Sequence, residues 1–227
     1  MFKTRGKTGL TYLEIAVTVA LFSVAMIITL AFMKSSFEGY DVQKTNCDSQ
    51  RAAQQVLERI AIELRPAKVV GAIPADGASI VMQVPVDPQG DGVVVDANGA
   101  IEWGAPEDTG DVVGSAITYR FVQTGTLRES ADGRDYNGNG RMTDSFAVGH
   151  VARTTTRGRT TKLGEGAVVQ PLGALGGDVD GDGSPDPIFS QNGDLVAVNL
   201  WTLRSGLNKE TFMTQAATTV RLRNPQQ

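Results

Sequence analysis

An apolar run of membrane length begins at Ile15 of this chain. Up to Met33, its only polar side chains are the hydroxyls of Thr18, Ser23 and Thr29, which can bond back to a helix carbonyl within lipid. At a rise of about 1.5 Å per residue, a helix of this length spans about 28 Å, close to the roughly 30 Å thickness of the hydrocarbon layer. The run therefore predicts one membrane-spanning helix.

The residues before the run carry two further features. Lys3, Arg5 and Lys7 form a short basic leader, and no other positive charge occurs before Lys34, so we expect the leader inside and the remainder outside. Glu14 places a carboxylate at the start of the helix. Burying an unpaired charge there costs about 2.5–3.5 kcal/mol, so Glu14 predicts a functional site with a partner.

Two simpler interpretations of the run are a cleaved secretory signal peptide and an uncleaved anchor. A signal peptide needs a small-residue cleavage site after its apolar core. The nearest candidate, Ser-Val-Ala at residues 23–25, lies in the middle of the run, and none follows Met33. An uncleaved anchor accounts for the length but not for the spacing between Gly9 and Glu14.

The stretch from Gly9 to Glu14, Gly-Leu-Thr-Tyr-Leu-Glu, resembles the prepilin signal of type IV pilins and type II secretion pseudopilins. The resemblance implies that a prepilin peptidase cleaves after Gly9 and that Leu10 becomes an N-methylated amino terminus. It also implies that Glu14 pairs with the terminal amine of a neighbouring subunit. The chain would then be anchored in the inner membrane with a periplasmic C-terminal domain, before it enters a pilus or pseudopilus filament.

Charge and cysteine content restrict the partners. Without the leader, 18 Lys and Arg face 25 Asp and Glu, a net charge of −7. This balance argues against nucleic acid as a partner, because affinity for phosphate depends on clustered cations. The single cysteine, Cys47, excludes an internal disulfide.

One basic stretch contains no aromatic residue to stack on bases, so we expect a solvated loop or a contact for an acidic neighbour. Its cations are Arg153, Arg157, Arg159 and Lys162.

The helix is predicted to continue beyond the membrane to about Leu64. Apolar residues recur there at three- and four-residue steps, which gives an amphipathic second half. These residues are Ala53, Val56, Leu57, Ile60 and Leu64. Pro66 ends the helix, because the residue before a proline is pushed out of helical geometry. We expect Gly39 and the polar residues 41–46 to kink or locally melt the helix.

After Pro66 the pattern changes to β-strands separated by turns, among them a turn at Gly125. The predicted strands are 79–86, 117–122, a segment around 168–169, 195–203 and 218–224. Together these elements predict an α+β fold, in which a long N-terminal spine helix packs on a mostly antiparallel sheet. The predicted organisation is a leader (1–9), a membrane or filament-core helix (10–33), its amphipathic continuation (34–65) and a β-rich domain (66–227).

The strand segments 117–128 and 220–224 resemble paired strands of the larger minor subunits of this family. Those subunits are the W-type minor pilins and the J-type minor pseudopilins. The resemblance implies a pilin-like domain and the role of a minor subunit.

An Asp-rich loop near the C-terminus predicts a calcium site. Asp178, Asp180, Asp182 and Asp186 occupy loop positions 1, 3, 5 and 9, with glycine at position 6 and the carbonyl of Ser184 available at position 7. This spacing wraps oxygen ligands around one hard cation and favours calcium. Position 12 is phenylalanine and no helix flanks the loop. The loop therefore resembles the shorter calcium loops of dockerin and thrombospondin-type repeats rather than an EF-hand.

A second loop has the same spacing at its first positions. Its predicted ligands are Asp135, Asn137, Asn139, Thr143 and Asp144. Two of them are neutral asparagines, so weaker calcium binding is expected. The alternative for both loops is a metal-free turn rich in Gly, Asp and Asn. A bound ion would replace the missing disulfide as a staple.

No pattern predicts catalysis, and we expect no enzyme. His150, the only histidine, is expected in a loop, and nothing resembles a nucleophile elbow. The leading hypothesis is a minor pilin, whose partners are other pilin or pseudopilin subunits, prepilin peptidase and the inner membrane. The alternatives are a minor pseudopilin of a type II secretion system and a DNA-uptake or adhesion subunit at a filament tip.

Overall fold

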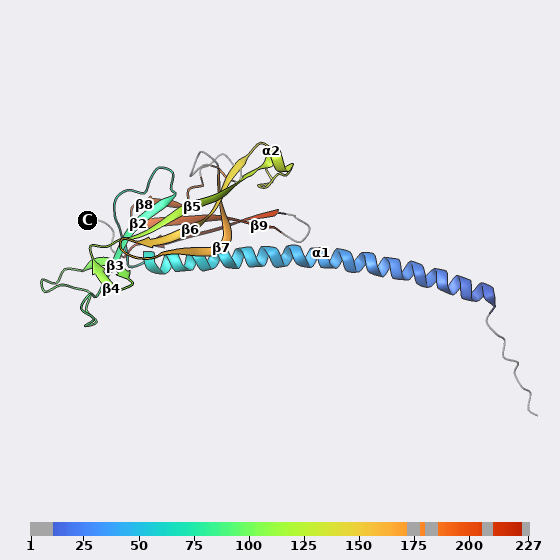
Figure 1. Ribbon diagram of the computed structural model, residues 1–227, viewed down its shortest axis with the longest axis horizontal. Helices are drawn as coiled ribbons and strands as arrows, with labels where there is room; N and C mark the ends of the chain where they lie inside the picture. The colour runs from blue at the N-terminus through green and yellow to red at the C-terminus, as the bar shows by residue number, and fades with distance from the viewer. Residues whose placement is uncertain (1–10, 172–177, 180–185, 206–210, 224–227) are drawn as a thin grey trace, which may run out of the picture. The chain divides into compact units, whose positions relative to one another are not determined.

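The structure is a computed structural model that describes residues 11–171, 178–179, 186–205 and 211–223. The chain divides into two compact units, Met1–Lys44 and Thr45–Gln227. Helix α1 (Tyr12–Leu64) supplies the described part of the first unit and the start of the second (Figure 1). It ends two residues before Pro66, as predicted. The expected local melting over residues 41–46 is wrong, because these residues are helical throughout.

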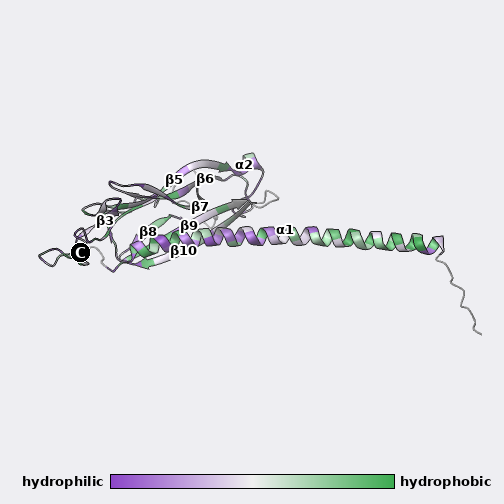
Figure 2. Ribbon diagram, turned by 60° about the horizontal axis from the view of Figure 1, so that its bottom comes forward, coloured by the Kyte–Doolittle hydropathy of each residue, from purple (hydrophilic) through white to green (hydrophobic). Residues whose placement is uncertain are grey.

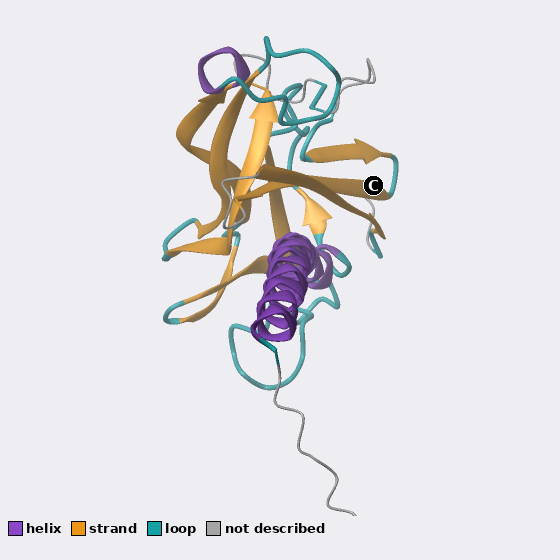
Figure 3. Ribbon diagram, turned by 90° about the vertical axis from the view of Figure 1, so that its right-hand side faces the viewer, coloured by secondary structure: helices purple, strands orange, loops and turns teal. Residues whose placement is uncertain are grey.

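The second unit is an antiparallel sheet with one short helix, so the predicted α+β class is confirmed. The elements are β1 (Lys68–Val69), β2 (Ser79–Pro85), β3 (Trp103–Glu107), β4 (Gly110–Val113), β5 (Ile117–Arg128), α2 (Glu129–Asp132), β6 (Ser145–Thr155), β7 (Thr160–Pro171), β8 (Phe189–Asn192), β9 (Leu195–Ser205) and β10 (Thr211–Arg221). The strand order is β10-β9-β7-β6-β5-β2-β3-β4, with β1 beside β2 and β8 beside β9. Figure 3 shows these strands as curved ribbons.

The amphipathic end of α1 forms the core with this sheet. All five predicted apolar positions between Ala53 and Leu64 are buried, and Ile60 and Leu64 are fully inaccessible. They pack against inward residues of the strands, such as Ile80 of β2 and Tyr119 of β5. Each Å² of apolar surface buried in this contact contributes about 25 cal/mol of stabilising free energy, which holds the helix end to the sheet.

The strands differ from the prediction in two places. β5 continues from Ile117 to Arg128, and Gly125 marks a bulge in its pairing with β6 rather than a turn. The bulge shifts the register by one residue and keeps the strand paired. The last strand, β10, begins at Thr211, earlier than predicted, and pairs along its whole length with β9.

Candidate functional site

Thr11 and Glu14, at the start of the described chain, form a helix cap in which each residue bonds to the other. The Glu14 N–H donates to Thr11 Oγ1 at 3.3 Å, while the Thr11 N–H and hydroxyl donate to Glu14 Oε2 at 2.8 and 3.1 Å. This capping box satisfies backbone donors that a helix start leaves without partners. The Thr-x-x-Glu signal is visible in the sequence, and the prediction that Glu14 pairs with a neighbouring subunit overlooked this partner within the chain.

Among the described residues, Thr11 is the contact of the Glu14 carboxylate, and both of its bonds reach Oε2. Gly9 and Leu10, the predicted processing positions, lie outside the described residues. Glu14 stands in the first turn of α1.

The first part of α1 has the surface of a membrane anchor. By length and composition, α1 is able to cross a membrane, and every residue from Thr11 to Tyr40 is exposed. The ribbon is green, hydrophobic, along this part and alternates with purple beyond it (Figure 2). Thr18, Ser23 and Thr29 each donate their hydroxyl to the carbonyl four residues earlier, at 2.7–2.8 Å, which confirms the predicted back-bonding.

The second predicted calcium loop is fully described, and it gathers three of its five predicted ligands. Asn137 Nδ2 and Asn139 Nδ2 donate to Asp144 Oδ2 at 3.2 and 2.7 Å. Asp135 accepts the N–H groups of the two loop glycines at 2.7 Å each, and so caps the turn. Thr143 immediately precedes Asp144. The loop is thus folded by hydrogen bonds between its own side chains and backbone, a geometry that the metal-free turn also predicts.

A buried carboxylate, Glu129 at the start of α2, joins the two ends of this loop. Glu129 is fully inaccessible. Its Oε1 accepts the Tyr136 N–H at 2.7 Å, its Oε2 accepts the Asp144 N–H at 3.1 Å, and its own N–H donates to the Asp144 carbonyl at 3.0 Å. Glu129 was not predicted. Leu127, two positions earlier, is half-buried, and residues two positions apart in a strand lie on the same face. This spacing was the available signal that the Glu129 side chain points inward.

Only the two ends of the first predicted calcium loop are described. Asp186 Oδ2 accepts the Val179 N–H at 3.0 Å, and its Oδ1 accepts Asn199 Nδ2 at 3.1 Å. Asn137 Nδ2 of the second loop donates to the Val179 carbonyl at 2.8 Å, which joins the second loop to the described start of the first. Outside the described residues lie three of the predicted ligands: Asp180, Asp182 and Ser184. Asp178 is half-buried next to Val179.

A small hydrophobic cluster, separate from the main core, lies beneath the paired loops. Phe146, Val179 and Trp201 are buried in it, and Tyr136 packs against it. Each loop therefore contributes one apolar residue, Val179 or Tyr136, to a common support. This support holds the second loop and Val179 in addition to their hydrogen bonds.

The chemistry of the second loop suits an oxygen-binding cation of low affinity. Asp135 and Asp144 supply carboxylates, and Asn137 and Asn139 would have to turn their amide oxygens inward, since their nitrogens now face Asp144. Within the described segments, no group of three or more His, Cys, Asp or Glu side chains gathers in a geometry for metal.

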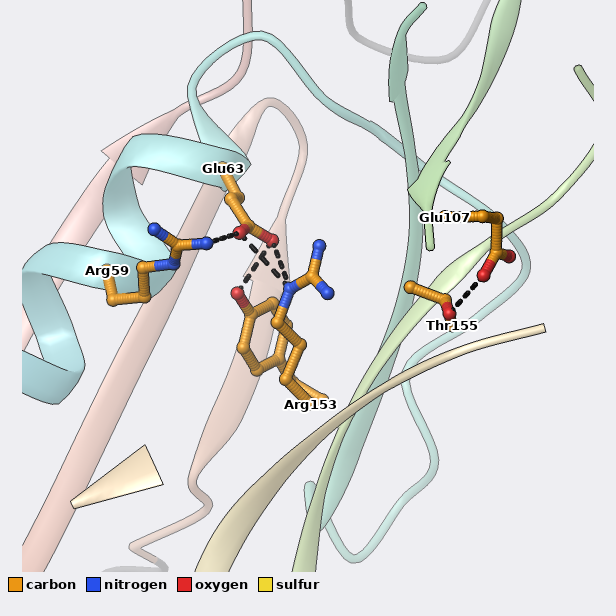
Figure 4. Close-up of polar contacts among 6 residues, drawn as sticks. Arg59, Glu63, Glu107, Arg153 and Thr155 are labelled. Carbon is orange, nitrogen blue, oxygen red and sulfur yellow. Dashed lines mark hydrogen bonds and ion pairs between the residues drawn. The ribbon is translucent and has the colours of Figure 1, made fainter. Parts of the chain in front are cut away.

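A polar network of four residues attaches the end of α1 to the sheet (Figure 4). Glu63 accepts the Tyr119 hydroxyl at 2.7 Å and Arg153 Nε at 3.0 and 3.1 Å, and Arg59 reaches it at 3.1 Å. The Glu63 and Arg153 side chains are 14% and 12% exposed. Burial, with the charge of Glu63, raises the pKa of Tyr119 well above its usual range. Tyr119 therefore stays a neutral donor.

The expectation of a solvated basic loop at 153–162 is wrong in part. Arg153 lies on β6 and its charge is used within the chain, while Lys162 lies on β7. Only Arg157 and Arg159 belong to the connecting turn, and both are exposed. His150, expected in a loop, is half-buried in β6 opposite Val122. Burial lowers the pKa of His150, and the charge on Lys162 acts in the same direction.

No protein-family model, curated protein or solved structure matches this chain. The architecture itself, a long apolar N-terminal helix whose end packs on an antiparallel sheet, is consistent with a pilin-like fold.

Proposed function

We propose that this chain is a minor pilin, a structural subunit of a type IV pilus or related filament. The observation that carries the proposal is the start of α1, where the carboxylate of Glu14 stands in the first turn of an exposed apolar helix of membrane length. A carboxylate in lipid is costly unless another group compensates it. A terminal amine on a neighbouring subunit, created by cleavage after Gly9, provides that compensation.

The remainder of the chain supports the same role. The apolar half of α1 has no cover within the described chain, so it needs lipid or other helices around it. The half that follows is anchored to the sheet by the core and by the Glu63 network. One helix thus joins a membrane or filament core to an outward domain. A minor pseudopilin of a secretion system would use the same parts in a different filament.

The contacts of Arg153 weaken the case for the DNA-uptake alternative. It depended on Arg153, Arg157 and Arg159 as free cations, and Arg153 is bound to Glu63. We therefore propose protein subunits, prepilin peptidase and the inner membrane as partners, and no catalytic activity. For the paired Asp/Asn loops we propose calcium as a structural ion.

The capping box makes a sharp test of Glu14 possible. Glu14→Ala removes the charge and the cap, whereas Glu14→Gln removes only the charge, because glutamine also closes a capping box. If Glu14 pairs with an amine, both variants insert into the membrane and both lose incorporation into filaments by roughly tenfold or more, the scale of one buried ion pair. Filament fractions probed with antibody, normalised to membrane content, measure this.

Two results would contradict the proposal. Normal incorporation of Glu14→Gln would show that Glu14 serves only the helix cap. A mature protein that keeps residues 1–9, determined by mass spectrometry, would exclude processing after Gly9. The expected mature chain begins at Leu10 and carries one added methyl group.

A further inference from the structure

The segment between β2 and β5 forms a projecting acidic lobe, residues 86–113, that includes β3 and β4 (Figure 1). It contains seven Asp or Glu residues and no Lys or Arg. It also exposes five large aliphatic side chains, each 38–52% accessible: Val93, Val94, Val95, Ile101 and Val113. Exposed apolar residues gathered in this way and surrounded by charge are typical of a protein-binding surface.

Hydrogen bonds from backbone N–H groups to two aspartates hold the turns of the lobe. Asp87 accepts the N–H groups of Gly90, Asp91 and Gly92 at 2.6–3.3 Å, and these bonds lower the pKa of Asp87, so it stays ionised. Asp96 closes the next turn by accepting two N–H groups. The valine residues therefore project from an ordered backbone.

Glu107 and Lys68 fix the lobe to the body of the domain. Glu107, on β3, accepts the hydroxyls of Ser115 and Thr155, the latter on β6 (Figure 4). These hydroxyls lower the pKa of Glu107. Lys68, on β1, lies 6.0 Å from the ring centre of Trp103 at the base of the lobe. A surface held in this way loses little freedom on binding.

A groove of opposite charge lies where the end of α1 meets β10. This arginine groove has a volume of about 650 Å³ and is lined by Arg65, Arg221 and Arg223, while Val220 and Leu222 beneath them are buried in the core. All three arginines are exposed. Among the described residues, Arg221 pairs with Asp194 at 2.6 Å, which leaves the groove with an excess of positive charge from Arg65 and Arg223.

We infer that the acidic lobe of one copy of this chain docks into the arginine groove of a second copy. The two surfaces are opposite in charge, since the lobe carries seven Asp or Glu residues and no Lys or Arg, and the groove presents three exposed arginines. Within a single chain both remain exposed. Such a contact joins unlike patches, which is the type of interface that can extend an assembly beyond a pair. The inference deepens the proposed filament role by naming one contact between subunits, and it rests on that role only for its biological setting.

The experiment uses full-length protein in detergent, in a Cys47→Ser background. One preparation carries Val94→Cys in the lobe, another carries Thr219→Cys in the groove, and the two are mixed and mildly oxidised. We expect mixed disulfide dimers to exceed either homodimer by at least tenfold. A matched control replaces Thr219→Cys by Gln123→Cys, an exposed position on β5 away from the groove, and should give only background cross-linking.

Charge reversal then tests the electrostatic part. Arg65→Glu with Arg223→Glu should lower the mixed dimer by roughly tenfold, whereas Arg128→Glu, an exposed arginine on β5, should leave it unchanged. Circular dichroism checks that each variant is folded. Equal yields from the control pair, or equal effects of the two charge reversals, would overturn the inference. No filament is needed for this assay, so its failure leaves the Glu14 test of the proposed function intact.

Discussion

Replacing Glu63 with alanine should destabilise the domain more than any other single change on the surface of α1. The carboxylate accepts from Tyr119, which is fully buried, and from Arg153, whose side chain is 12% exposed. Removing one partner of a buried ion pair costs about 3–5 kcal/mol, because the other charge stays buried without compensation. The neutral donor Tyr119 also loses its acceptor, at a further cost of about 1–3 kcal/mol if nothing replaces it.

The two costs are not additive, since water can reach the space that Glu63 vacates. We therefore expect a loss of about 3 kcal/mol in the free energy of unfolding. For a domain of this size, each kcal/mol shifts the melting temperature by about 2–4 °C, so the expected decrease is about 6–12 °C. The assay is thermal unfolding of the full chain in detergent, followed by far-ultraviolet circular dichroism at the β-sheet signal.

A matched control separates this network from general effects on the helix. Arg59 also contacts Glu63, but its side chain is 59% exposed, so Arg59→Ala should cost no more than about 1 kcal/mol. A second control, Arg153→Met with Glu63→Gln, removes both charges and should recover part of the loss. A Glu63→Ala variant that melts within about 1 °C of the Arg59→Ala variant would refute the assigned role of Glu63.

Two other predictions follow from Tyr119 and the paired loops. Because the pKa of folded Tyr119 lies above its ordinary value of 10.0, its contribution to stability is complete below pH 10 and is lost as the pH rises further. Urea unfolding should thus show stability falling above pH 10, with a shallower fall in Tyr119→Phe; parallel curves would contradict this. If calcium staples the loops, EDTA should lower the melting temperature by several degrees relative to millimolar calcium, and Asp144→Ala should remove the part of that difference that the second loop contributes. Identical curves for the unaltered chain in EDTA and in calcium would exclude the ion.

Local pattern was sufficient for α1. Its apolar residues at helical spacing and Pro66 predicted both the buried face and the end at Leu64. The Thr-x-x-Glu signal at its start could also have been recognised, since a capping box involves only neighbours in the chain. Gly125 shows where local pattern misled. A glycine permits a turn or a bulge, and only the partner strand β6 selected the bulge.

The sequence by itself determined the helix, the alternating strands, the absence of a disulfide and the two Asp/Asn-rich loops, because each depends on residues close together in the chain. Only the tertiary structure decided that Arg153 faces Glu63, that Glu129 closes the second loop and that this loop bonds to Val179 of the first. These pairs are joined across strands or loops, and Glu63 and Arg153 are 90 positions apart. The physical reason is that a charge on a strand or helix can be compensated by any group that the packing of the core brings near it. The local periodicity of the sequence does not predict which group that is.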